Sequence, residues 1–438
     1  MLWHRGGPTG LPEEFSVLLH EEVPVTPGAY VPHVTPQRVL ALADDLSGAA
    51  ETAIALRVPG RLSLGVPTSP GPADASLVMD LDTRQAGPDT AAEAVRDALA
   101  LTAGHRLLFK KVDSLLRGNV ASEAAAFAVG ARAVVTATAL PVLGRTVRDG
   151  IVHLRGAALH TTDAWRAEHR PPPQSVAAVL TGLHTAGVPL CTVRSGVGHL
   201  SSHLRDLAEQ GRHAVCDAET DDDLDAVAAA TLALGPGFRA LGCGGLAAAF
   251  GRLLVQRAPE ADVPSTPRSH SPKRPLLMVV GTAEPTAVAQ IAQLTALGAH
   301  HFVLPTRDLL DGTCTLPATL APNGITVLSI GNTPAVTPSS SRRLADALAR
   351  TAARLSAEGP APDLVLTGGE TARRTLDALG VAELTPLGQV HHGAVLSRTA
   401  DGRSVVTRPG SFGDTRSLLR IAHALRPAAT AHLEGEHL

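Results

Sequence analysis

The chain has 438 residues and a formal net charge of −3, from 38 basic and 41 acidic side chains. That balance, with an aromatic content of only 2%, argues against a basic nucleic-acid surface and against base-stacking platforms. No apolar run approaches the length of a transmembrane helix. We therefore expect no nucleic-acid or membrane partner, and a chain long enough for two domains.

The four cysteines are widely spaced along the chain, at Cys191, Cys216, Cys243 and Cys314. Their spacing matches neither a zinc site nor a disulfide framework. Reduced thiols in a cytoplasmic protein are the simplest interpretation.

Two segments differ in composition from the rest of the chain. Residues 1–37 are rich in Pro and Gly and lack the pattern of a signal peptide, so we expect a flexible N-terminal extension. Residues 258–274 are rich in Pro and Ser and predict a linker. This places a first domain at 38–257 and a second at 275–438.

In the first domain, apolar runs alternate with helical patterns. Strands are predicted at 38–43, 77–81, 106–110, 131–137, 188–193, 213–216 and about 240–245, and helices at 49–56, 90–102 and 246–256. The second domain repeats the alternation. It has predicted strands at 275–280, 301–304, 326–330, 363–367 and 405–408, and helices at 286–297, 339–358, 371–379 and the C-terminus. The pattern predicts an α/β fold with two domains, each with a largely parallel sheet flanked by helices.

The chain contains only three lysines, and two of them are adjacent at Lys110 and Lys111. They open a polar run, 110–119, at the end of a predicted strand. Polar residues also follow two other predicted strands, at 44–45 and 82–84. Ligands collect beyond the carboxyl ends of parallel strands. Lysine and arginine side chains bind anions there, so the pattern favours a small, anionic, hydroxyl-rich ligand. The alternative is a charged loop after a buried strand.

The consecutive carboxylates Asp44 and Asp45 are candidates for acid–base chemistry. A carboxylate that accepts a proton from a substrate hydroxyl is common in phosphoryl transfer. An Asx turn or helix N-cap would explain the same residues. Arg145, in the loop 144–146, adds another guanidinium.

Three glycine-containing turns in the second domain, at 281–285, 367–371 and 410–413, follow predicted strands. Such turns let a phosphate approach backbone N–H groups at a helix N-terminus. A tight turn with a helix cap is the alternative. Neither a Walker A sequence nor a dinucleotide fingerprint occurs. The histidine pairs at 300–301 and 391–392 lack metal-ligand spacing, and no metal site is expected from protein ligands alone.

These motifs together resemble the four-carbon acid sugar kinase family, which includes 3-oxo-tetronate and erythronate/threonate kinases. The resemblance rests on segments 43–49, 111–119, 144–146, 367–372 and 410–414, and covers about residues 38–425. It implies a sugar-acid-binding first domain, a nucleotide-binding second domain, and ATP-dependent phosphorylation of a terminal hydroxyl. It also implies Mg²⁺ with the ATP. The expected partners are the sugar acid and ATP, and a homodimer is compatible with this assignment.

The resemblance, read with the side-chain chemistry, assigns roles to individual residues. Asp45 is the expected base, with Asp113 as the alternative. Lys111 is expected on the substrate carboxylate or the transferred phosphate, and Arg117 on the substrate carboxylate. The remaining substrate-binding candidates are Asp44, Asp113, Ser114 and Arg145. The ATP-binding candidates are Thr282, Glu284, Gly368, Gly369, Glu370, Thr371, Gly410 and Gly413. We interpret Lys110 as a solvated neighbour of Lys111.

Three positions depart from the family pattern. Leu115 stands where Thr is usual, Glu284 where Ser is usual, and Arg408-Pro409 where Lys and Ser or Thr are common. Glu284 leaves open a non-catalytic sugar-acid-binding regulatory protein. Leu115 leaves open a kinase for another small polyol acid.

Overall fold

The computed structural model describes residues 38–68, 75–101, 107–166, 168, 170–256, 274–282, 284–316, 319–320, 324–331, 338–410 and 413–427. The predicted N-terminal extension at 1–37 lies outside these residues, and so does the predicted linker apart from Arg274.

The first half of the described chain forms a parallel sheet in the order β2-β3-β1-β4-β11-β5-β10-β9. Its strands are β1 (Val39–Ala43), β2 (Gly60–Leu64), β3 (Ser76–Asp80), β4 (Leu107–Lys111), β5 (Ala133–Ala137), β9 (Thr185–Val188), β10 (His213–Cys216) and β11 (Phe238–Gly242). The helices are α1 (Leu46–Ala55), α2 (Pro88–Leu99), α3 (Val120–Ala128), α4 (Val176–Val179), α5 (Leu190–Val193), α6 (Val197–Glu209), α7 (Asp221–Leu234) and α8 (Gly244–Gln256). The central strands are buried along their whole length because helices cover both faces.

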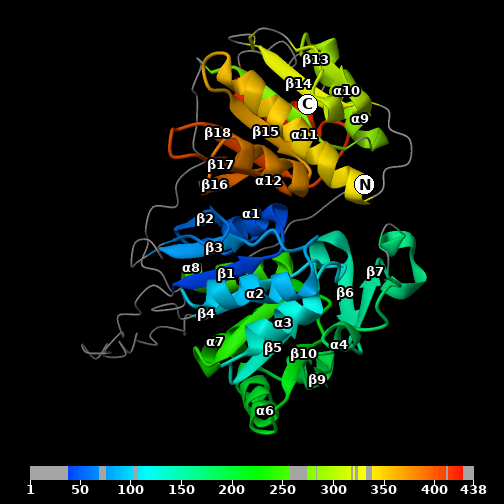
Figure 1. Ribbon diagram of the computed structural model, residues 1–438. Coiled ribbons are helices and arrows are strands. Elements are labelled where there is room, and N and C mark those ends of the chain that lie inside the picture. The colour runs from blue at the N-terminus through cyan, green and yellow to red at the C-terminus, as the bar shows by residue number, and fades with distance from the viewer. Residues whose placement is uncertain are drawn as a thin grey trace, which may run out of the picture. The chain divides into compact units, whose positions relative to one another are not determined.

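The helices of this half form two groups (Figure 1). Helix α2 packs on α3, whereas α1, α8, α7 and α6 pack in succession on one another. Because successive strand residues face opposite ways, neighbouring side chains of β4 reach different groups. Lys110 contacts Glu123 of α3, and Lys111 contacts Glu51 of α1.

A small antiparallel sheet interrupts this alternation. It consists of β6 (Arg145–Arg148), β7 (Ile151–Leu154) and β8 (Ala157–Ala158), with short 3₁₀ turns at Pro141–Leu143, Leu159–Thr161 and Asp163–Trp165. Arg145 therefore begins a strand, where a loop was predicted.

The second half forms a sheet in the order β13-β14-β12-β15-β18-β17-β16. Its strands are β12 (Leu276–Val280), β13 (His300–Leu304), β14 (Ile325–Ile330), β15 (Asp363–Thr367), β16 (Glu383–His391), β17 (Ala394–Arg398) and β18 (Ser404–Arg408). The first five strands in the order are parallel, and β17 and β16 are antiparallel. Helices α9 (Pro285–Ala296) and α13 (Ser417–Leu425) pack together, as do α11 (Pro338–Ala357) and α12 (Gly369–Ala378), and α10 (Thr306–Asp311) packs on α11.

The two sheets meet through one short antiparallel pairing. Glu383 and Leu384 of β16 pair with Ser63 and Leu62 of β2, which joins these two sheets into one of 15 strands, separate from the sheet of β6, β7 and β8. The α/β fold with largely parallel sheets is confirmed. No helix among the described residues is long and apolar enough to cross a bilayer.

The predicted strand at 188–193 is wrong beyond its first residue. Strand β9 ends at Val188, Pro189 follows at the N-cap position, and Leu190–Val193 form helix α5. Proline has no N–H for a strand ladder and suits a helix start, so the chain turns there despite its β-branched residues.

Candidate functional site

The ends of the neighbouring strands β3, β1 and β4 bring together five charged side chains, which we call the strand-end cluster: Asp44, Asp45, Arg84, Lys111 and Asp113. Arg84 organises it. Its Nε and Nη2 donate to the two carboxylate oxygens of Asp44 at 2.8 and 3.0 Å, and its Nη1 donates to Asp45 Oδ2 at 2.7 Å. Adjacent strands therefore unite the 44–45 and 82–84 segments, as their predicted positions at strand ends indicated.

Asp45 is also the N-cap of α1. Its Oδ1 accepts a hydrogen bond from Gly48 N at 2.8 Å. A Cβ added to Gly48 would lie 2.8 Å from Asp45 Oδ1 and 3.1 Å from Lys111 Nζ. The capping interpretation is thus correct, and it is compatible with chemistry because the second oxygen of Asp45 faces Arg84.

The two adjacent aspartates have oppositely shifted pKa values. Burial alone would raise the pKa of Asp44, but the positive charges of Arg84, Lys110 and Lys111 outweigh it and lower that pKa. Burial raises the pKa of Asp45, and the negative charge of Asp44 adds to that rise against Arg84 and Lys111. Asp44, with the lowered pKa, therefore stays an anion. Asp45, with the raised pKa, is better suited to accept a proton.

The two lysines differ from expectation in one respect. Lys111 is buried, and its Nζ lies 3.5 Å from Glu51 Oε2 and donates to Val112 O at 3.1 Å. Lys110 is wholly buried, and its Nζ lies 2.9 Å from Glu123 Oε2. The interpretation of Lys110 as a solvated residue is therefore wrong, because helix α3 covers that face of β4.

The loop after β4 carries Asp113, Ser114 and Arg117, and Arg145 reaches it from the start of β6. Arg117 Nε and Nη2 donate to the carboxylate of Asp113 at 2.6 and 3.0 Å. Burial would raise the pKa of Asp113, but these hydrogen bonds and the charge of Arg84 hold it well below its usual range. Arg145 Nη1 donates to Ser114 Oγ. The structure thus brings Arg145 to this loop, as the residue assignments required.

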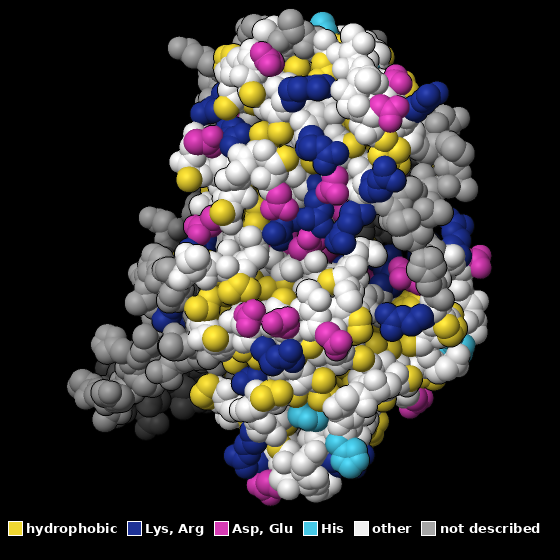
Figure 2. Space-filling model, viewed as in Figure 1, with side chains coloured by type: hydrophobic (Ala, Val, Ile, Leu, Met, Phe, Trp, Pro, Cys, Tyr) yellow, Lys and Arg dark blue, Asp and Glu magenta, His cyan; other side chains and the backbone are white. Residues whose placement is uncertain are grey.

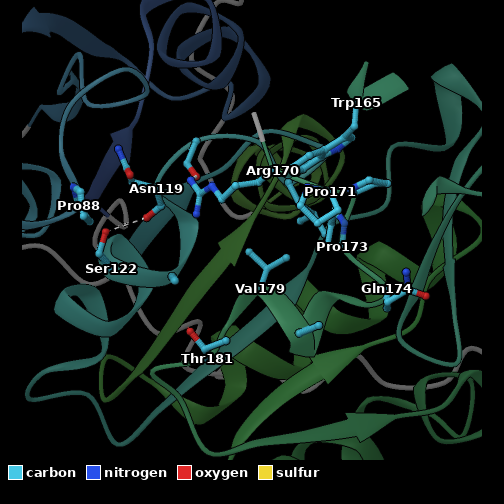
Figure 3. Close-up of a pocket in the computed structure, with 15 residues that line it drawn as sticks. Pro88, Asn119, Ser122, Trp165, Arg170, Pro171, Pro173, Gln174, Val179 and Thr181 are labelled. Carbon is cyan, nitrogen blue, oxygen red and sulfur yellow. Dashed lines mark hydrogen bonds between the residues drawn. The ribbon is translucent and has the colours of Figure 1, made fainter. Parts of the chain in front are cut away.

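A cavity of about 420 Å³ lies behind the same loop, with Leu116 and Gly118 in its wall. In Figure 3 Asn119 and Ser122 lie on one side of it and Trp165 and Pro171 on the other. The indole of Trp165 donates to Leu115 O at 2.8 Å, and the Leu115 side chain is buried in the hydrophobic core. Such anchoring supports the positive φ of Leu116, 63°.

The three glycine turns of the second half also converge, because they follow the adjacent strands β12, β15 and β18. A Cβ on Gly281 would overlap Thr371 Oγ1 and lie 2.8 Å from Thr371 Cβ. A Cβ on Gly410 would lie 3.4 Å from Thr282 Cβ and 3.8 Å from the Cα of Gly368, which has a φ of 97°. This glycine cradle at the start of α12, in which the Thr371 side chain packs against Gly281, has the features of a phosphate site.

The charged residues near these turns differ in exposure. Glu284 is exposed at the N-cap position of α9 and makes no side-chain cap bond. Burial raises the pKa of Glu370, whose Oε1 lies 3.4 Å from Arg342 Nε. Arg408 is buried and donates to Ser417 Oγ and to Gln290 Oε1. In Figure 2 basic and acidic side chains gather at the level of α12.

An apolar groove of about 700 Å³ lies beside Thr282, between α9 and the strands β13 and β14. Its lining includes Val288, Ile291, His301, Val303 and Ile330. A volume of this size holds a nucleoside, whose ring binds apolar walls with few polar contacts. The groove and the glycine cradle meet at Thr282, as a base-and-phosphate ligand requires.

Comparison with known proteins identifies the two halves. A family model described as a sugar-binding N-terminal domain matches residues 39–250, and one described as a nucleotide-binding C-terminal domain matches residues 277–418. A D-threonate kinase of Cupriavidus necator is 35% identical over 414 residues, covering 88% of this chain and 97% of that enzyme. The chain belongs to the four-carbon acid sugar kinase family. It is thus an ATP-dependent sugar-acid kinase.

Other four-carbon acid sugar kinases and solved structures agree. A D-threonate kinase of Bordetella bronchiseptica is 29% identical, covering 88% of this chain and 96% of that enzyme. A solved structure from Salmonella typhimurium LT2 has a TM-score of 0.73 at 20% identity, covering 89% of this chain and 99% of its own. One from Haemophilus influenzae has a TM-score of 0.68 at 20% identity, covering 87% and 98%. These two structures support the fold.

Some residues in and around the strand-end cluster were not assigned from the sequence. Arg84 stood in a noted strand-end segment, but its partners could not be known. Glu51 and Glu123 lie on helices with no local signal, and only packing brings them to the lysines. Among the residues that the structure describes, no group of three His, Cys, Asp or Glu side chains could hold a metal ion.

Asp80, at the end of β3, is wholly buried, and its Oδ2 lies 2.9 Å from Arg373 Nη1 of α12. Burial raises its pKa to about 7. Because the folded pKa exceeds the unfolded value, the stabilisation from this proton is fully present below about pH 4 and is lost as pH rises through 7. We expect the free energy of unfolding to fall over that window, by about 1.4 kcal/mol for each pH unit between the unfolded and folded pKa values.

Urea denaturation at pH 5 and pH 8 measures this effect. Asp80→Asn should abolish that part of the pH dependence, since the amide does not titrate. A variant with the same decline as the wild type would contradict the assignment to Asp80.

Proposed function

We propose that the protein phosphorylates D-threonate, or a four-carbon sugar acid of the same chemistry, at its terminal hydroxyl. Three D-threonate kinases, 35%, 29% and 27% identical, support this substrate class. The strand-end cluster would bind the acid, and the glycine cradle with the adjoining groove would bind ATP. Residues 38–257 and 275–438 would be the corresponding domains.

One observation carries this proposal. A Cβ added to Gly369 would lie 3.1 Å from Asp45 Oδ2 and 3.1 Å from Ser47 Oγ. Gly369 is the first residue of α12, where backbone N–H groups favour a phosphate. The proton-accepting carboxylate and the phosphate-binding helix start are thus close enough for one transfer.

Each residue's role follows from its contacts. Asp45 would accept the proton of the attacking hydroxyl, because its pKa is raised while those of Asp44 and Asp113 are lowered. Nε and Nη2 of Arg117 donate hydrogen bonds to Asp113. The remaining nitrogen, Nη1, would donate to the substrate carboxylate. Lys111 stays charged, because Glu51, Asp45 and Asp44 outweigh the burial that alone would lower its pKa. It would neutralise the carboxylate or the transferred phosphate.

The glycine cradle and the adjoining apolar groove are suited to ATP by their shape and lining. The space at Gly368 and Gly410 would admit phosphate oxygens, and the groove beside Thr282 would admit the nucleoside, while the missing side chain of Gly281 makes room for Thr371. Mg²⁺ would arrive on the phosphates, since it keeps several waters and is seldom held by protein ligands alone. When bound, it would neutralise charge developing on the transferred group. Thr371, Glu370 and Gly413 would border the phosphates, and Glu284 the edge of the site.

The direct test is ATP consumption with purified protein and a panel of C4 sugar acids, D-threonate among them. Arg117→Ala should raise the KM for the acid by about 10- to 100-fold, because a charge-assisted hydrogen bond contributes about 1.5–3 kcal/mol. The KM for ATP should not change.

Arg132→Ala provides the control, since Arg132 is an exposed arginine paired with Glu209 away from the cluster. It should leave both KM values unchanged. If the Arg117→Ala enzyme has the wild-type KM for the acid, Arg117 does not bind the substrate. Light scattering tests the homodimer, which stays a proposal.

A further inference from the structure

Lys110 and Glu123 form an ion pair that is closed off from solvent on the face of β4 opposite to α1. The side chains are 0% and 1% exposed, and the Nζ–Oε2 distance is 2.9 Å. A buried ion pair of this kind often stabilises no more than an apolar pair of the same volume. Its presence behind a catalytic strand end therefore suggests a role other than stability.

The pair is connected to the turn that carries Arg84. The hydroxyl of Thr83 donates to Glu123 Oε1, and Asn119 Nδ2 donates to Thr83 O at 2.8 Å. The backbone N–H groups of Thr83 and Arg84 both donate to Asp44 O, at 3.0 and 3.1 Å. Thr83 is thus held by its hydroxyl, its carbonyl and its N–H.

Holding Thr83 fixes the starting point of the next side chain. Arg84 must reach three carboxylate oxygens on two residues, and its planar fork tolerates little displacement. A shift of about 1 Å in a supporting group can lower turnover a hundredfold. The chain of contacts from Lys110 through Glu123 and Thr83 therefore ends on the two aspartates.

We propose that Lys110, Glu123 and Thr83 are positioning residues that hold Arg84 on Asp44 and Asp45 and so set which aspartate accepts the proton. This inference rests on the proposed function, in which Asp45 is the base. All three residues are buried, so none of them would touch the substrate.

The electrostatic influences on Asp44 and Glu123 support the positioning role of Lys110. After burial and Arg84, Lys110 is the next influence on Asp44, and it lowers that pKa. Burial raises the pKa of Glu123, against the charge of Lys110. The other charged groups that face the two aspartates are Arg84, Lys111 and, through Lys111, Glu51.

Four variants test the inference. Lys110→Met combined with Glu123→Gln removes both charges together and avoids a lone buried ion. It should lower kcat by roughly tenfold to a hundredfold with little change in KM. It should also move the acid limb of the kcat profile to higher pH, because Asp44 must stay ionised to hold Arg84 and loses a cation that lowers its pKa. Glu123→Gln alone keeps that cation and should not move the limb to higher pH. Thr83→Val should lower kcat without moving the limb, and Thr83→Ser should restore it.

The matched control is Arg426→Met combined with Asp363→Asn. That pair is also buried, at 2.7 Å, and Asp363 likewise accepts a second hydrogen bond, from Ser404 N. It should leave kcat and its pH profile unchanged. The same loss in the control, or wild-type kcat and profile in both the Lys110/Glu123 and Thr83→Val variants, would overturn the inference.

The proposed function fails separately, if the wild type consumes no ATP with any C4 sugar acid. A crystal structure of the Lys110/Glu123 double variant then decides the inference. Arg84 with both aspartate contacts intact would overturn it, and a displaced Arg84 would support it.

Discussion

Replacing Asp45 by Asn should lower kcat by roughly a hundredfold to ten-thousandfold, the usual contribution of a positioned general base, because Asp45 is the proposed base. The amide cannot accept the hydroxyl proton, but its oxygen can still accept the Gly48 N–H bond at the start of α1. The cap should therefore persist, but the amide NH2 cannot accept from Arg84 Nη1, so the free energy of unfolding should fall by about 1.5–3 kcal/mol. Steady-state kinetics with ATP and the preferred sugar acid, and denaturation of the same preparation, measure both quantities.

Asp45→Ala separates the two roles of this residue. It removes the cap as well as the base, and should lose about a further 1 kcal/mol of unfolding free energy. The acid limb of the wild-type kcat profile should be absent from Asp45→Asn if Asp45 produces it. If Asp45→Asn keeps the wild-type kcat, another residue is the general base. Asp113 is a weak replacement, because Arg117 binds its carboxylate and holds its pKa low.

Gly281→Ala should abolish most nucleotide binding. The new Cβ would overlap Thr371 Oγ1 and lie 2.8 Å from Thr371 Cβ, so either the turn or the start of α12 must move. Overpacking of this kind costs about 1–3 kcal/mol of stability. In the proposed function the displaced backbone borders the phosphates, so we expect ADP affinity to fall at least about tenfold, equivalent to 1.4 kcal/mol. Calorimetry with ADP and urea denaturation measure the two effects.

Gly359→Ala is the control in the same half of the chain. Nothing lies within 4 Å of a Cβ at that position, and its φ is not in the left-handed region. It should leave ADP affinity and stability unchanged. If Gly281→Ala loses stability but binds ADP normally, the turn at 281 is a packing contact only.

The sequence predicted those site residues whose position depends only on lying at the end of a parallel strand. Polar residues at 44–45, 82–84 and 110–119 follow three strands, and a parallel sheet places such ends along one edge. The glycine turns at 281, 368 and 410 were found in the same way. Partners from helices were not predictable, because Glu51 and Glu123 have no local motif. The strand expected at 188–193 failed because β-branched residues fit a short helix as well once Pro189 starts it.

The sequence by itself determined the alternation of strands and helices, the family, and the residue types at the strand ends, because period and motif order are local properties. Only the tertiary structure decided which charges meet. Lys110 and Lys111 are identical neighbours in the sequence, yet β4 directs one to Glu123 and the other to Glu51. Packing likewise set the opposite pKa shifts of Asp44 and Asp45, since proton affinity depends on burial and on charges brought from distant segments.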